Sequence, residues 1–246
     1  MIKSNMRKID AIAKVMEDNG GVASLNMIYN NITKYYPTAN KSESWQDGIR
    51  VVLYREIKNN RMFKKIGIGI YALTDYDEET RPAHSDSPRM HSYMEGICIE
   101  LGSIENYETF TADPSASFRD NIYLRDIASI HILPPFTYSG VLNDVKRIDV
   151  MWFSKGKYPY PKKVFEIVDS ISTLNSAFNR TLRLKDFQTK FYIVAPEKHH
   201  EKFCQTLDLE VYESYKERFS FINYDDMNNL YESSICKNEL ESRLLG

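Results

Sequence analysis

The chain has 246 residues, of which 42% are hydrophobic and 27% charged, and this composition is typical of a folded globular protein rather than a disordered or fibrous one. No apolar run approaches the roughly 20 residues that span a bilayer, and the N-terminal stretch mixes charged with apolar residues, so we expect neither a membrane anchor nor a signal peptide. The three cysteines lie far apart and match no zinc-site spacing, which favours a reducing, cytoplasmic compartment.

The net charge of −2 conceals an uneven distribution. Residues 1–74 contain 12 Lys and Arg against 6 Asp and Glu, whereas the remainder contains 20 against 28. A basic unit attached to an acidic body indicates that the first unit meets a polyanion, although an offset of this size is also compatible with a solvated face.

Residues 1–74 carry three helical patterns and then a hairpin pattern. The third helix opens at Ser42 or Ser44, and its apolar stripe extends to Ile57. Three helices followed by a two-stranded ribbon is the order of a winged helix, so we expect a winged-helix domain over residues 1–74. The other expected elements are helices at 4–19, capped by Ser4, and at 25–36, and strands at 62–66 and 70–74.

In a winged helix the third helix usually enters the major groove of DNA and the wing lies along the backbone. Winged helices also serve as adaptors between proteins, in which case their charges only solvate a surface. The stretch 45–74, WQDGIRVVLYREIKNNRMFKKIGIGIYALT, resembles winged-helix modules fused to bacterial restriction and modification-related nucleases, which favours DNA as the partner. The candidate DNA-contacting residues are Arg50, Arg55, Lys58, Arg61, Lys64 and Lys65.

Residues 75–89 are polar, acidic and aperiodic, and they predict a linker, with His84 and His91 beside it interpreted as incidental. The order of elements in residues 90–246 favours an α/β (α+β) core, in which helices cover both faces of a partly parallel sheet. The expected helices are at 90–102, 173–187, 197–207 and 225–234, and the expected strands at 107–112, 146–153, 162–170, 190–196 and 219–224.

Two acids stand inside apolar strand-like runs, Asp149 in KRIDVMWF and Glu166 in VFEIVDS. A carboxylate within a buried strand is costly unless it is paired or binds a cation. Two of them on successive strands can meet and form a hard oxygen site for Mg²⁺ or Mn²⁺. The alternative is that nearby cations, such as Arg147 and Lys163, satisfy both acids, and the residue chemistry alone does not decide between the two.

The stretch from about 90 to 232 resembles one subgroup of the PD-(D/E)xK nuclease core, in which a helix HSxxxGxxxELG precedes IDVxWF and FEVExST. The corresponding segments here are HSYMEG (91–96), IDVMWF (148–153) and FEIVDS (165–170). The resemblance implies a restriction endonuclease that hydrolyses double-stranded DNA, with Asp149 and Glu166 as catalytic and metal-binding acids and with no organic cofactor. A homodimer is also expected, since one active site per chain must cut two strands.

One position departs from the family pattern. Val168 stands where the family places Lys or Glu, two residues after the second acid, and valine neither carries charge nor holds water. Strand alternation directs Lys162 to the same face as Glu166, and Lys190 opens the next strand. The candidates for the missing functions are therefore Lys162 and Lys190 as the catalytic cation, with Glu95 or Asp169 as a further oxygen ligand.

Arg180 and Arg183 lie three residues apart on the helix after Glu166, which makes them candidates to clamp a neighbouring phosphate, or else solvated helix charges. A non-catalytic DNA-binding regulator or adaptor with a degenerate nuclease fold is the alternative to an endonuclease. The buried acids favour the endonuclease, because a regulator has no reason to keep Asp149 within an apolar strand.

Overall fold

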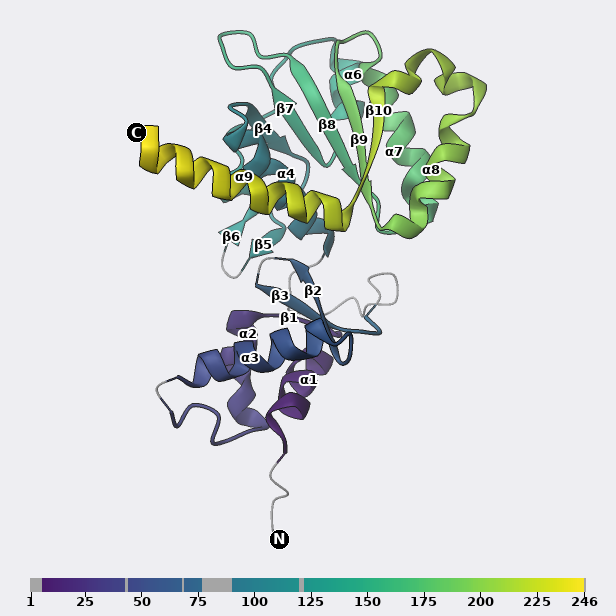
Figure 1. Cartoon of the computed structure of the whole chain (residues 1–246). Helices are drawn as coiled ribbons and strands as arrows, with labels where there is room; N and C mark the ends of the chain where they lie inside the picture. Colours follow the sequence, from purple (N-terminus) through teal and green to yellow (C-terminus); the bar gives the residue numbers. More distant parts are fainter. Residues whose placement is uncertain (1–5, 43, 68, 77–89, 120–121, 246) are drawn as a thin grey trace. The chain divides into compact units, whose positions relative to one another are not determined.

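The computed structural model in Figure 1 describes residues 6–42, 44–67, 69–76, 90–119 and 122–245. The chain divides into two compact units, Met1–Pro88 and Arg89–Gly246. Among the helices so described, none is both long and apolar enough to cross a membrane. Residues 77–89 of the expected linker lie outside the described residues, and so does Ser4. The expectation that Ser4 caps the first helix is wrong, because α1 begins at Lys8 and its N-cap is Arg7.

The N-terminal unit packs three helices against a small antiparallel sheet with the strand order β1-β3-β2. Ile12, Ile49 and Phe63 are among the buried side chains of its core. The three predicted helices and the hairpin are present, although α1 and α2 are shorter than expected. The elements are α1 (Lys8–Asp18), β1 (Val22–Ser24), α2 (Leu25–Asn31), a 3₁₀ turn η1 (Ile32–Lys34), α3 (Trp45–Lys58), β2 (Phe63–Gly67) and β3 (Ile70–Leu73).

Local signals explain where these elements begin and end. The Ser24 side chain accepts a hydrogen bond from the Met27 amide at 3.1 Å and so caps α2. Gly20 and Gly21 follow α1 with positive φ angles, a conformation that glycine adopts without strain. The expected second helix continues past Asn31 only as a 3₁₀ turn, and β1 was not predicted because three residues are too few to show alternation.

The C-terminal unit is built on a mixed five-stranded sheet with the order β10-β9-β8-β7-β4. β7 pairs antiparallel with both β4 and β8, whereas β9 runs parallel to both β8 and β10. Parallel neighbours need crossover connections, and α7 and α8 lie in them. The strands are β4 (Glu108–Thr111), β7 (Val150–Phe153), β8 (Pro161–Ile167), β9 (Lys190–Ala195) and β10 (Phe219–Asn223), with a separate pair β5 (Ser117–Arg119) and β6 (Ile122–Tyr123).

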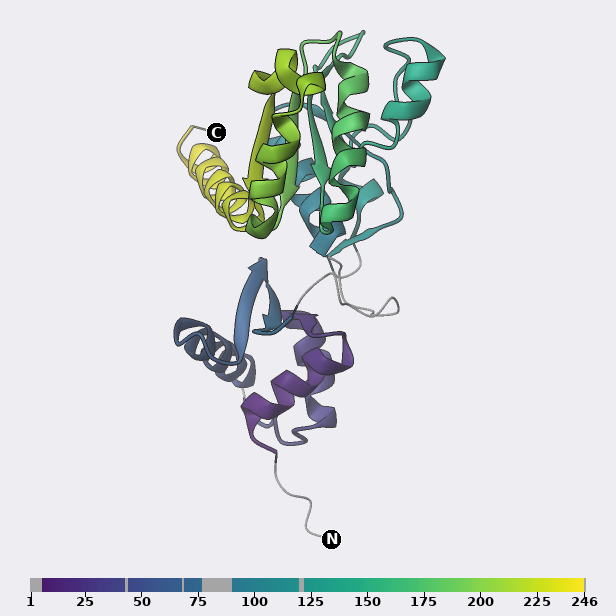
Figure 2. The ribbon, with the colours of Figure 1, turned by 90° about the vertical axis from the view of Figure 1, so that its right-hand side faces the viewer.

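Strand alternation produces two helical layers, with α4 and α9 on one face of the sheet and α7 and α8 on the other (Figures 1 and 2). Met151 and Val164 point into the main core with α7, whereas Trp152 points the other way and donates from Nε1 to the carbonyl of Cys98 on α4 at 2.9 Å. The predicted mixed sheet covered on both faces is confirmed. The helices are α4 (Met90–Ile104), α5 (Leu124–Ile127), α6 (Ser139–Val145), α7 (Leu174–Thr181), α8 (His200–Leu207) and α9 (Tyr224–Leu245).

Several boundaries differ from the expectation. β7 begins at Val150 rather than at 146, because α6 and a turn occupy the residues before it, so Asp149 stands at the entrance of the strand and not within it. The expected helix 173–187 is α7 followed by a 3₁₀ turn. The closing helix α9 reaches Leu245 instead of 234, since the stretch 235–245 contains neither Gly nor Pro.

Candidate active site

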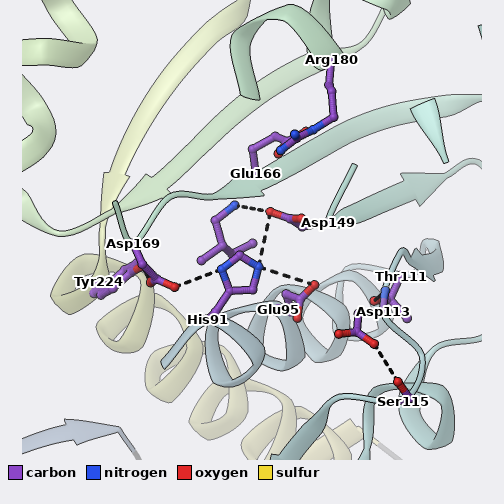
Figure 3. A network of polar contacts seen from close by, with 11 residues as sticks. His91, Glu95, Thr111, Asp113, Ser115, Asp149, Glu166, Asp169, Arg180 and Tyr224 are labelled. Atoms are coloured by element: carbon purple, nitrogen blue, oxygen red, sulfur yellow. Dashed lines mark hydrogen bonds and ion pairs between the residues drawn. The ribbon is translucent and has the colours of Figure 1, made fainter. Parts of the chain in front are cut away.

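A cluster of polar side chains lies where α4 approaches the adjacent ends of β7 and β8 (Figure 3). His91 and Glu95 are four residues apart on α4 and project from the same face of the helix. Asp149 directly precedes β7, and Asp169 follows β8. These four residues, His91, Glu95, Asp149 and Asp169, are called the α4 cluster below.

The imidazole of His91 lies at the centre of the α4 cluster. Its Nδ1 is 3.1 Å from Oδ2 of Asp169, and its Nε2 is 3.7 Å from Oδ2 of Asp149 and 4.0 Å from Oε1 of Glu95. Asp169 in turn accepts a hydrogen bond from the hydroxyl of Tyr224 on α9. Burial lowers the pKa of His91, but hydrogen bonds to Asp149 and Asp169 outweigh this effect and raise it to about 11.

The backbone of the neighbouring strand positions Asp149. Its Oδ2 accepts a hydrogen bond from the Ile167 amide at 2.7 Å. Since β7 and β8 are antiparallel and Val150 lies opposite Phe165, the register also brings Asp149 beside Glu166. Asp149 is therefore held by fixed geometry at the junction of the two strands.

Glu95 is the most deeply buried member of the α4 cluster, with only 2% of its surface exposed. Burial raises the pKa of its carboxyl group, and the negative charge of Asp149 adds to the rise, while His91 opposes it. Within the described part of the chain, nothing forms a hydrogen bond with its buried Oε2. Such an orphaned oxygen is costly to bury, and a carboxylate of this kind is suited to bind a cation.

A pocket of about 480 Å³ connects the α4 cluster with solvent. Exposed Lys146 and Arg147 line it together with the buried Glu95, so basic and acidic groups face the same space. This combination suits a cation on the carboxylates and an anionic ligand on the basic side chains. The remaining lining residues are His91, Ala112, Asp113 and Asp149.

Glu166, the second predicted acid, faces the side of the sheet that α7 and α8 cover. It has no exposed surface, and Arg180 of α7 donates from Nε to its Oε1 at 2.7 Å and from a second nitrogen to its Oε2. Strand alternation explains the direction, because Val164 on the same face of β8, and Val168 just after the strand, belong to the core beneath α7. Burial raises the pKa of Glu166, while the Arg180 hydrogen bonds act against that rise.

Two of the three predicted metal ligands, Asp149 and Glu95, come together in this structure, and His91 joins them. One ligand atom from each of these three residues lies within 4.8 Å of the others. Glu166 stands beside Asp149 but outside this group, because its carboxylate is engaged by Arg180.

The two predicted catalytic lysines lie toward the opposite end of the sheet. Lys162 precedes Glu166 by four residues on β8, and Lys190 pairs in register with Lys163, three residues before Glu166. A strand rises about 3.3 Å per residue, so their backbones are roughly 10–13 Å from that of Glu166. The structure therefore places neither lysine in the α4 cluster.

The predicted phosphate-clamping arginines both contact acids of the same unit. Arg180 binds Glu166, and Arg183 lies 3.0 Å from Asp144 on α6. The two arginines therefore do not form a pair on one face of the helix, because Arg180 is paired with Glu166 and Arg183 with Asp144.

The predicted DNA-contacting residues of the N-terminal unit follow α3 and the β2–β3 hairpin. Lys64 is half-buried and donates from Nζ to the carbonyl of Tyr76 at 2.7 Å. Arg50 lies 3.0 Å from Asp47 on the same helix. The exposed members of the set are Arg50, Arg55, Lys58, Arg61 and Lys65.

Sequence reasoning assigned no role to His91 and only a secondary one to Asp169. A usable signal was present, since the spacing of His91 and Glu95 puts two potential ligands on one face of a helix that is otherwise apolar and buried. Tyr224 offered no such signal, because its contact with Asp169 depends on how α9 packs beside α4.

A family model describing the C-terminal domain of the type II restriction enzyme NmeDI matches residues 73–242, more than half of the chain. The chain belongs to this family. The NmeDI C-terminal domain match includes the whole five-stranded sheet, the α4 cluster and the pair of Glu166 with Arg180. Neither a curated protein nor a solved structure matches the chain.

Proposed function

We propose that this protein is a type II restriction-like endonuclease that hydrolyses phosphodiester bonds of double-stranded DNA with Mg²⁺ or Mn²⁺. Membership of the NmeDI C-terminal domain family supports the class of enzyme. The observation that carries the metal dependence is the meeting of Asp149 with Glu95, whose orphaned oxygen is buried beside a solvent-connected pocket.

The element order supports a PD-(D/E)xK core. A helix, α4, precedes three strands that are antiparallel neighbours in the sheet, β4, β7 and β8, and α7 then leads to the parallel strand β9. The two acids of the motif lie beside each other, Asp149 at the entrance of β7 and Glu166 within β8, and this supports the PD-(D/E)xK reading.

Asp149 and Glu95 would hold the metal ion. When bound, such an ion lowers the pKa of a water molecule and stabilises the negative charge of the reacting phosphate. The Ile167 amide keeps the Asp149 carboxylate in place, and Lys146 and Arg147 of the pocket would bind the DNA phosphates. Glu166 is proposed as the second acid of the site, acting from beside Asp149.

For the N-terminal unit we propose a winged helix that contacts DNA. The order α1, β1, α2, α3, β2, β3 and the three-stranded sheet support this reading, and so do the exposed basic residues of α3 and the hairpin. A homodimer is part of the proposal, since two active sites are needed to cut both strands of a duplex.

A protein that binds DNA without cutting it is the second candidate function. Val168 in place of a charged residue favours it, and so does the engagement of Glu166 by Arg180. Incubation with plasmid and genomic DNA, methylated and unmethylated, separates the two. We expect cleavage with Mg²⁺ or Mn²⁺ and none with EDTA, whereas binding without cleavage under every condition would support the second function.

A further inference from the structure

We propose that His91 is a nitrogen ligand of the metal site, that Asp169 and Tyr224 position it, and that the resulting site prefers Mn²⁺ to Mg²⁺. This inference rests on the proposed metal-dependent function and names the ligand that completes its site. His91 comes from α4, ahead of the strands that supply the acids of the sequence motif.

The distances fit one ion shared by three side chains. Metal ions of this size hold nitrogen and oxygen ligands at about 2.0–2.2 Å, so two ligands of one ion are at most about 4.4 Å apart. Nε2 of His91 lies 3.7 Å from Oδ2 of Asp149 and 4.0 Å from Oε1 of Glu95, both within this limit. The ligand atoms of Asp149 and Glu95 lie within 4.8 Å of each other, so the three side chains surround a volume close to the size that one ion needs.

The opposite nitrogen of His91 is held by a partner. Nδ1 lies 3.1 Å from Oδ2 of Asp169, and the Tyr224 hydroxyl donates to Oδ1 of the same carboxylate. A carboxylate that accepts the Nδ1 proton fixes the orientation of the ring, so that Nε2 offers its lone pair once a metal ion displaces the Nε2 proton, the arrangement common to metal-binding histidines. Asp169, just after β8, and Tyr224, at the start of α9, thus direct Nε2 of His91 toward Asp149 and Glu95.

Glu95 provides an independent observation. Its Oε2 is buried and, among the residues described, has no hydrogen-bonding partner, although it belongs to the same side chain that approaches His91. Glu166 is bound by Arg180 and lies outside the group of His91, Glu95 and Asp149, so the imidazole of His91 is the third protein ligand within reach of the ion.

The donor set determines the metal preference. Mg²⁺ binds oxygen ligands and keeps its water molecules, whereas imidazole nitrogen suits the transition metals, and carboxylates suit Mn²⁺ as well as Mg²⁺. One nitrogen with two carboxylates therefore favours Mn²⁺. Removing the nitrogen should weaken Mn²⁺ binding more than Mg²⁺ binding.

Pulsed EPR of Mn²⁺ bound to the full-length protein without DNA tests the inference directly. We expect ¹⁴N coupling from a bound imidazole in the wild-type protein and its loss in His91→Ala. Titration calorimetry should show Mn²⁺ affinity reduced by about 100-fold in His91→Ala and by about 10-fold in Asp169→Asn, which loses only the positioning group. His131→Ala, which replaces an exposed histidine outside the α4 cluster, should bind Mn²⁺ like the wild-type protein.

The absence of ¹⁴N coupling in wild-type protein would overturn the assignment, and this result does not depend on whether any variant folds. Failure of the wild-type protein to bind Mn²⁺, or equal affinities for Mn²⁺ and Mg²⁺, would also overturn it. DNA cleavage without nitrogen coupling would retain the endonuclease and reject His91 as a ligand. Nitrogen coupling without cleavage of any DNA would retain the metal site and reject the endonuclease.

Discussion

Arg180 on α7 donates hydrogen bonds to both carboxylate oxygens of Glu166 on β8, and Glu166 is completely buried. Glu166, which the sequence pattern predicts as a metal ligand, therefore has both of its carboxylate oxygens hydrogen-bonded to Arg180 in this structure. The ion pair also joins the crossover helix to the centre of the sheet, so it contributes to the stability of the unit that carries the proposed active site.

We predict that Arg180→Met destabilises the protein by about 3 kcal/mol, because it leaves the buried Glu166 carboxylate without its partner. Urea unfolding followed by circular dichroism measures the change. The double variant Glu166→Gln with Arg180→Met should recover part of the loss, since a neutral amide is less costly to bury than a charge.

Arg183→Met is the matched control for this prediction. Arg183 lies on the 3₁₀ turn after α7 and pairs with Asp144, but both side chains are largely exposed, so their contact contributes at most about 1 kcal/mol. Equal stability of the Arg180 and Arg183 variants would contradict the structural role of the Glu166 pair.

The fold of the C-terminal unit was largely predictable because its strands are short apolar runs that alternate between two layers. β8 and β9 both begin within one residue of their expected positions, and α4 begins at the expected residue. The first residue of β7 was not predictable from hydrophobicity. Ile148 lies in the turn before the strand, but it is apolar and buried, as a strand residue would be.

The partners of the site residues were less predictable than the residues themselves. Asp149 and Glu95 were identified from their chemistry, but the contact of His91 with Asp169 joins positions 78 residues apart and depends on the rotation of α4 against the sheet. Likewise, the sequence pattern is compatible with Arg180 as a solvent-exposed charge on a helix, and its contact with Glu166 depends on how α7 packs on β8.

Close packing at Gly96 fixes the position of α4. A Cβ added to Gly96 would lie 2.0 Å from Cδ2 of the fully buried Phe118 ring, so Gly96→Ala forces the ring or the helix to move. We predict a loss of about 2 kcal/mol in the free energy of unfolding, measured by urea denaturation.

Gly140→Ala is the control for this packing prediction. Gly140 lies in α6, and an added Cβ meets nothing within 4 Å. Alanine there should be neutral or should stabilise the protein by up to about 1 kcal/mol through its higher helix propensity. If Gly96→Ala were as stable as Gly140→Ala, the placement of α4 against Phe118 would be wrong.

The proposed role of the N-terminal unit predicts a change in the salt dependence of DNA binding. Lys58 and Arg61 are exposed at the end of α3 and after it, and each phosphate contact adds about 0.9 to the slope of log K against log salt concentration. The double variant Lys58→Gln with Arg61→Gln should reduce the magnitude of that slope by about 1.8, measured by fluorescence anisotropy.

Lys14→Gln serves as the comparison, because Lys14 lies on α1 and pairs with Glu17. It should leave the salt slope unchanged. A slope of the double variant equal to that of the wild-type protein would exclude Lys58 and Arg61 from the DNA interface.

We propose that Asp149 holds the metal ion with which this protein cuts DNA. The most direct measurement compares Asp149→Asn with Asp208→Asn, which changes an exposed aspartate after α8. DNA cleavage with Mn²⁺ and DNA affinity are measured on the same preparations. We predict that Asp149→Asn loses cleavage by at least about 100-fold while keeping its DNA affinity, and that Asp208→Asn cleaves like the wild-type protein. Cleavage by Asp149→Asn at the wild-type rate would contradict it.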